Sequence, residues 1–291
     1  MVLSLSISVA IGLGACLMGA APRLAWPSQH RQTHETKRQT KTRPSLLIGD
    51  DGANVFTDED STTDTTIQER GGDDVVDLTG PSNDAIFGGD GNDNVSPGDE
   101  DDEVFLGLGD DFFGDIGRRN DPDYGRENLV RGQSDNDTLT SLGGQDSLFV
   151  DMGNDMVNTN YFLPQFDGVQ ARPDIGFGGL GNDQMLFDDG HTVSCGEGVD
   201  AFQLQVDSAK ATAVTITDVD PATVALQINI FDGSNPLFTH ENSFNEASEF
   251  ADLSFVQDGN ATQIVLNGTQ VLAILQNVDV AALSPADIQV S

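Results

Sequence analysis

The sequence predicts an all-β repeat protein in which short strands are joined by glycine turns, and three observations predict it. The pattern G-G-x-G-x-D-x-U, with U apolar, recurs in the middle of the chain, most completely at 88–95 and 178–185. An Asp stands two residues before an apolar residue in ten rows of fixed phase. The last third of the chain consists of short β-type runs, such as 213–217 and 225–230. A recurring step of about nine residues is typical of a β-solenoid.

Composition and charge exclude several classes of protein. The 291 residues include 48 Asp and Glu but only 13 Lys and Arg, which gives a net charge of -35. We exclude a nucleic-acid-binding protein, because a polyphosphate requires a basic surface. The two cysteines, Cys16 and Cys195, are too few for a disulfide scaffold. So acidic a chain repels itself, and it is either disordered or compacted by bound positive charge.

The N-terminal 48 residues differ from the rest. Residues 1–22 carry no charged side chain, and residues 23–48 form a basic linker. The first 43 residues sum to +5 and the remainder to -40. Three interpretations of residues 1–22 stay open: a signal or membrane anchor, a lipoprotein-like segment lipidated at Cys16, and an apolar terminus without a targeting role. We expect membrane contact only through this segment, if it is retained.

The repeat block covers residues 49–206. Its apolar positions are expected on short strands that point inward: Val76, Ile86, Val95, Val104, Phe113, Leu139, Leu148, Val157, Met185 and Phe202. The aspartates two residues earlier are Asp74, Asp84, Asp93, Asp102, Asp111, Asp137, Asp146, Asp155, Asp183 and Asp200. An opening copy has Asn54 where this Asp belongs. Acidic low-complexity sequence would not keep this phase.

These residue types together indicate a calcium site. Glycine permits the positive φ that a tight turn requires, and such a turn exposes main-chain carbonyls beside the Asp carboxylate. Ca²⁺ accepts 6–8 oxygen ligands in flexible geometry, whereas Mg²⁺ demands a strict octahedron. No His or Cys cluster suits Zn²⁺. We therefore predict metal ligands among the ten aspartates and the turn residues Gly88, Gly89, Asp90, Gly91, Gly109, Gly178, Gly179, Gly181, Gly196 and Gly198.

Residues 49–206 resemble the RTX family, whose haemolysin-type repeat is this nonapeptide. The resemblance implies a parallel β-roll with two nonapeptides per coil and Ca²⁺ between turns one coil apart, about 18 residues. It implies roughly five Ca²⁺ ions here. The like-sided pairs would be separated by 17 to 19 residues: Asp74/Asp93, Asp93/Asp111, Asp84/Asp102, Asp137/Asp155 and Asp183/Asp200.

The repeat also departs from the pattern. Glu100 and Asp135 replace the third glycine of their rows, so these turns are expected to bind weakly or to serve only as structure. Insertions at 114–130 and 158–177 interrupt the repeat. In a solenoid, long insertions become loops on one face, often a binding face. We therefore predict a degenerate roll, interrupted by two loops.

The C-terminal region, 207–291, is predicted to cap the roll with β-strands. Two apolar runs, 262–266 and 270–275, are joined through Asn267-Gly268, which is a strong hairpin signal. Asp258-Gly259 marks the preceding turn. The RTX resemblance further implies that this region is read by a type I secretion apparatus, which needs no N-terminal signal.

The sequence shows no convincing catalytic motif, and we predict no catalytic or organic-cofactor residues. The motif at 34–38 lacks the second His of HExxH, the one at 132–136 lacks the last Gly of a nucleophile elbow, and His191 is expected to be a turn residue. We predict a secreted or cell-surface calcium-binding structural or binding protein that folds on extracellular Ca²⁺. Two alternatives stay open, a calcium-dependent adhesin and an RTX-type enzyme or toxin whose insertion site would be lined by Phe113, Tyr124, Tyr161, Phe162 and Phe166.

Overall fold

A computed structural model describes most of the chain from residue 45 onward. The described residues are 45–58, 62–115, 126–141, 143–159, 173–188, 190–207, 212–221, 225–231, 253–283 and 288–290. The predictions for residues 1–22 and most of the basic linker lie outside them. So do Tyr124, Tyr161, Phe162 and Phe166, which were expected to line a site in the insertions.

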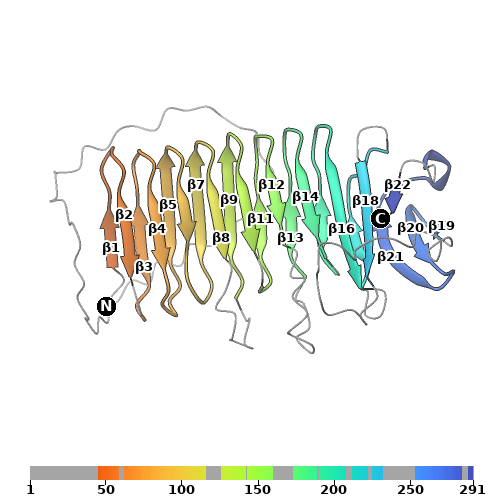
Figure 1. Ribbon diagram of the computed structural model, residues 1–291, viewed down its shortest axis with the longest axis horizontal. Coiled ribbons are helices and arrows are strands. Elements are labelled where there is room, and N and C mark those ends of the chain that lie inside the picture. Colours follow the sequence, from red (N-terminus) through yellow and green to blue (C-terminus); the bar gives the residue numbers. More distant parts are fainter. Residues whose placement is uncertain are drawn as a thin grey trace, which may run out of the picture. The chain divides into compact units, whose positions relative to one another are not determined.

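The fold is an all-β parallel roll made of two facing sheets, as the sequence predicts (Figure 1). Successive strands alternate between the sheets, so two strands and two turns make one coil. The first sheet contains, in spatial order, β1 (Ser45–Ile48), β3 (Thr65–Gln68), β5 (Ala85–Asp90), β7 (Glu103–Leu108), β9 (Leu129–Ser134), β11 (Ser147–Phe149), β13 (Ile175–Phe177), β15 (Thr192–Ser194) and β17 (Val214–Ile216). The second contains β2 (Val55–Asp58), β4 (Val75–Leu78), β6 (Asn94–Ser96), β8 (Phe112–Asp115), β10 (Thr138–Ser141), β12 (Met156–Asn158), β14 (Gln184–Phe187), β16 (Ala201–Asp207), β18 (Ala225–Phe231) and β22 (Ile288–Val290).

The core lies between the two sheets and is filled by the residues that the repeat places there. All ten apolar positions indexed from the sequence are at most 1% exposed. The alternation follows from the two-residue period of a strand, which turns every second side chain inward. Phe113 belongs to this core, so it does not line a site in the insertions. Cys195 is a free, buried cysteine in the same core.

The roll is longer than the predicted block of residues 49–206. β1 begins at Ser45, inside the predicted linker, because Leu47 packs against the core and the strand pairs in parallel with β3. At the other end, β17 and β18 continue the two parallel ladders beyond residue 206. β22 also extends the second sheet by pairing in parallel with β18, so three strands of the predicted C-terminal region, β17, β18 and β22, are part of the roll.

An antiparallel unit follows the roll, as the sequence predicts. It consists of β19 (Leu253–Asp258), β20 (Ala261–Leu266) and β21 (Gln270–Leu275), followed by the short 3-10 helix η1 (Val280–Ala282). Asn267 and Gly268 both have positive φ, 53° and 69°, as the tight hairpin turn requires. β21 pairs in parallel with β17, which joins this unit to the first sheet.

None of the residues described here forms a helix of the length and hydropathy that a bilayer crossing requires.

Candidate metal sites

The coils place their turns along two edges of the roll. We call the edge formed by the turns from each odd-numbered strand to the next even-numbered strand the Gly–Asp edge; its turns are 49–54, 69–74, 91–93, 109–111, 135–137, 150–155, 178–183 and 195–200. The turns that lead back to the first sheet form the opposite edge. The insertions at 114–130 and 158–177 both lie between an even and an odd strand, so both interrupt the opposite edge.

A ladder of aspartates runs along the Gly–Asp edge. The backbone N–H of each member donates to Oδ1 of the member one coil further on, at donor–acceptor distances of 2.6–3.0 Å. The members are Asn54, Asp74, Asp93, Asp111, Asp137, Asp155, Asp183 and Asp200. The pairs Asp74/Asp93, Asp93/Asp111, Asp137/Asp155 and Asp183/Asp200 are thus neighbours, at the spacing the sequence indicates.

The second carboxylate oxygen of most of these aspartates is buried and has no hydrogen-bond partner. This holds for Oδ2 of Asp74, Asp93, Asp111, Asp137, Asp155 and Asp183. Burial and then neighbouring carboxylates, opposed by hydrogen bonds from backbone N–H groups, raise the pKa of Asp93 to about 6, those of Asp111 and Asp155 to about 7 and that of Asp137 to about 8. Buried charges are ordinarily paired or bound to a metal, so this edge requires either protons or cations.

Turn carbonyl oxygens lie in line with this ladder. Gly91 and Gly109 have φ of 131° and 129°, and a Cβ on either would clash with the carbonyl oxygen of Gly72 or Gly91 in the preceding turn. Gly198 is packed in the same way against the carbonyl of Gly181. Glycine is therefore required by positive φ and by the close approach of successive turns. Carbonyl and carboxylate oxygens together are the donor set that Ca²⁺ prefers.

Two predicted departures keep the turn shape without glycine. Glu100 and Asp135 have φ of 79° and 76°, in the left-handed region that the replaced glycine would occupy. Asp90, predicted as a ligand, has an exposed side chain, and its carbonyl oxygen accepts the Gly72 N–H at 2.7 Å. The Asp90 carboxylate therefore stands apart from the ladder.

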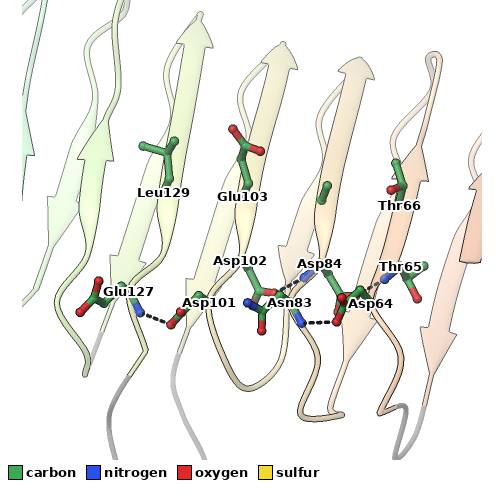
Figure 2. Close-up of a pocket in the computed structure, with 11 residues that line it drawn as sticks. Asp64, Thr65, Thr66, Asn83, Asp84, Asp101, Asp102, Glu103, Glu127 and Leu129 are labelled. Carbon is green, nitrogen blue, oxygen red and sulfur yellow. Dashed lines mark hydrogen bonds between the residues drawn. The ribbon is translucent and has the colours of Figure 1, made fainter. Parts of the chain in front are cut away.

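A second ladder, with mixed residue types, runs along the opposite edge. Each member's backbone N–H donates at 2.7–2.9 Å to a side-chain atom one coil further on, as Figure 2 shows from Thr65 to Asp84 and from Asp84 to Asp102. Its members are Thr65, Asp84, Asp102, Asn128, Asp146, Asp174 and His191. Sequence reasoning missed four of them, because the search required Asp-x-U. The coil spacing from Asp146 to Asp174 and on to His191 was the available signal.

Side chains of the protein reach the second oxygens of three aspartates on this opposite edge. The Ser82 hydroxyl donates to Oδ2 of Asp84 at 3.1 Å, and the Ser141 hydroxyl donates to Oδ2 of Asp146. Oδ2 of Asp174 lies 3.2 Å from Nδ1 of His191. The predicted ligands Asp84 and Asp146 therefore have no free second oxygen to offer a cation.

Arg126 supplies positive charge inside the opposite edge. Its buried guanidinium donates to Oδ1 of Asp115 at 2.9 Å and to the carbonyl of Gly98 at 3.1 Å, and lies 3.4 Å from Oδ1 of Asp99. Oδ2 of Asp102 has no hydrogen-bond partner, and burial raises the pKa of this carboxyl to about 9 while the charge of Arg126 opposes the rise. The two edges thus differ in how their carboxylates are compensated.

The surface of the opposite edge carries an open acidic groove over the first coils. Asp64, Asp101, Glu103 and Glu127 line it, and Figure 2 shows the Glu127 backbone N–H donating to Asp101 and that of Asn83 to Asp64. These outer carboxylates are exposed to solvent, unlike the aspartates of the two ladders.

The sequence matches no protein-family model and no curated protein. Among solved structures, the chain is similar to the solution structure of the AlgE6R3 subunit from the Azotobacter vinelandii mannuronan C5-epimerase. The TM-score is 0.28 and the identity 20%, over 56% of this chain and 77% of that chain. We draw nothing about function from a likeness at this level.

Proposed function

We propose that the protein is a secreted or cell-surface calcium-binding protein whose roll is held together by Ca²⁺ along the Gly–Asp edge. One observation carries the proposal: a line of buried Asp oxygens without hydrogen-bond partners runs along this edge, where turn carbonyls also gather. On the opposite edge, side-chain hydroxyls donate to Oδ2 of Asp84 and Asp146, and the positive charge of Arg126 acts on Asp102. This difference between the two edges favours cations as the missing partners of the carboxylates on the Gly–Asp edge.

The proposed ligands come from successive coils. We call the space between two neighbouring ladder aspartates an interval. In each interval an ion would be held by Oδ2 of the ladder aspartates and by carbonyl oxygens of the adjoining glycine turns. Carboxylate and carbonyl oxygens are hard ligands, and the flexible coordination geometry of Ca²⁺ accommodates them better than the fixed octahedron of Mg²⁺. Asp84 and Asp146 are proposed as structural residues instead, because Ser82 and Ser141 occupy their second oxygens.

An extracellular location is part of the proposal. Extracellular calcium modules bind with dissociation constants of about 10⁻⁴–10⁻³ M, so each site adds about 1.4–2.7 kcal/mol of stability at roughly 10 mM Ca²⁺. At submicromolar Ca²⁺ this contribution vanishes, and the repulsion among the acidic residues opposes compaction. We propose that the chain is exported unfolded by a type I secretion apparatus and folds outside. That route rests on the RTX resemblance.

No described residue favours catalysis or adhesion over this structural role. The enzyme alternative depended on a site in the insertions, and Phe113, its one described lining residue, is buried in the core. We therefore propose no reaction for the protein.

Circular dichroism of the full chain tests the proposal. In EGTA at neutral pH we expect a marginally stable roll with reduced β-structure, and addition of Ca²⁺ should produce a cooperative gain that Mg²⁺ at the same concentration does not reproduce. Equal β-content in EGTA and in Ca²⁺ would remove the proposal. Calorimetric titration gives the number of ions bound.

A further inference from the structure

One position of the repeat alternates between glycine and a buried side chain along the Gly–Asp edge. This position lies five residues before each member of the aspartate ladder. Extending the parallel register from coil to coil, its occupants are Gly49, Glu69, Gly88, Leu106, Gly132, Val150, Gly178 and Cys195. Leu106, Val150 and Cys195 belong to the apolar core. Glu69 therefore puts a carboxylate where equivalent coils put an apolar side chain.

Glu69 has no partner that explains its burial. Its residue is only 6% exposed, and neither carboxylate oxygen has a hydrogen-bond partner. The neighbouring occupants of the position, Gly49 and Gly88, carry no side chain that could donate to it. Arg70, the next residue, is exposed, and no basic side chain among the described residues pairs with Glu69. An uncompensated buried carboxylate costs several kcal/mol, so Glu69 requires either a proton or a bound cation.

The Glu69 carboxylate is aimed at two members of the aspartate ladder. Ligand oxygens of Glu69, Asp74 and Asp93 all lie within 4.8 Å of one another, the one such trio of His, Cys, Asp or Glu among the described residues. Oδ2 of Asp74 and of Asp93 are both buried without a partner. Oxygens on opposite sides of one Ca²⁺ are about 4.8 Å apart, because Ca–O distances are about 2.3–2.6 Å. The trio therefore has the dimensions of a single calcium site.

We propose that Glu69, Asp74 and Asp93 form a three-carboxylate cation site that binds calcium more tightly than the other intervals of the Gly–Asp edge and fills first. The inference rests on the proposed function, because the other intervals are the reference for its affinity. Elsewhere on the edge, glycine or an apolar residue stands where Glu69 stands, and no other interval among the described residues brings three carboxylates within 4.8 Å of one another. Affinity for Ca²⁺ rises with the number of charged ligands. The third carboxylate also favours a trivalent ion over Ca²⁺.

Calorimetric titration of the full chain with Ca²⁺, and separately with Tb³⁺, tests this site. The wild-type protein should show one tight step that precedes a group of weaker ones. Glu69→Gln keeps the size of the side chain and removes its charge, and should weaken the tight step by at least about tenfold while the weaker group stays. The same variant should lower the preference for Tb³⁺ over Ca²⁺. The matched control is Glu103→Gln, an exposed glutamate on β7, which should change neither.

The outcomes separate this site from the proposed function. If Glu69→Gln binds both ions as the wild type does, the three-carboxylate site is wrong, although calcium binding by the edge stands. If the wild type binds no calcium at all, both are wrong. Should Glu69→Gln fail to fold in Ca²⁺, Glu69→Leu carries the same comparison, because it introduces the side chain found at the equivalent Leu106. This variant should fold, lose the tight step, and be more stable than the wild type in EGTA.

Discussion

The substitution Asp111→Asn should change sign in its effect on stability when calcium is added. Asp111 accepts the Asp93 N–H through Oδ1 at 2.7 Å, and its Oδ2 is buried without a partner. Asn keeps the size of the side chain and the Oδ1 acceptor, and it removes only the negative charge. In EGTA the variant should therefore be as stable as the wild type or more stable, because a buried charge next to Asp93 has been removed.

In calcium the same variant should be destabilised. Loss of one site with a dissociation constant of about 10⁻⁴–10⁻³ M costs about 1.4–2.7 kcal/mol at roughly 10 mM Ca²⁺. Asp111 borders two intervals of the ladder, toward Asp93 and toward Asp137, so loss of both would cost about 3–5 kcal/mol. Urea unfolding followed by circular dichroism at both calcium levels measures the difference.

The control is Asp146→Asn on the opposite edge. There Ser141 already donates to Oδ2, so the change in unfolding free energy should be the same in EGTA and in calcium. If Asp111→Asn also cost the same under both conditions, or if it destabilised the protein in EGTA alone, no ion would be bound at Asp111 and the reasoning would be refuted.

Three further predictions follow from the two edges. Arg126→Met should destabilise the roll by about 3–5 kcal/mol in urea unfolding, with and without calcium, because it removes the positive partner of the buried Asp115 carboxylate; a calcium-dependent loss would contradict the role given to Arg126. Gly91→Ala should lower the melting temperature in calcium by several degrees, because φ is 131° and the new Cβ would clash with the Gly72 carbonyl; an unchanged melting temperature would contradict the close stacking. In EGTA the roll should be more stable at pH 5 than at pH 8, because burial raises the pKa of Asp93 to about 6 and those of Asp111 and Asp155 to about 7, so their neutral forms favour the folded state and this stability is lost as pH rises through those values. Calcium should remove or invert that dependence. Melting curves in EGTA across this pH range measure it, and a metal-free roll that became more stable as pH rises would contradict the prediction.

The repeat phase was sufficient to predict the coil and the Gly–Asp ladder. An Asp two residues before an inward apolar residue, as at Asp93 and Val95, fixes both the turn side chain and the core side chain, because the strand period is two. The hairpin at Asn267-Gly268 was predictable for the same local reason, since few residues adopt positive φ.

The opposite edge was not predictable from that pattern. Thr65 and Asn128 occupy ladder positions without being Asp, and the insertions stretch the coil spacing to 26–28 residues. Arg126 lies in an insertion, and nothing local indicates that it would reach Gly98 and Asp115. Glu69 stands at a position that other coils fill with glycine or an apolar residue. Such residues are recognised only once the coils are stacked, because their partners are one coil away.

Anomalous diffraction from crystals grown with calcium tests most directly whether calcium binds along the Gly–Asp edge and not along the opposite edge. The account predicts peaks in the intervals between successive aspartates from Asp74 to Asp200, including one among Glu69, Asp74 and Asp93, and none between Asp84 and Asp146 beside Arg126. Equal peaks along both edges, or a folded roll with no peak beside Asp93 and Asp111, would contradict it.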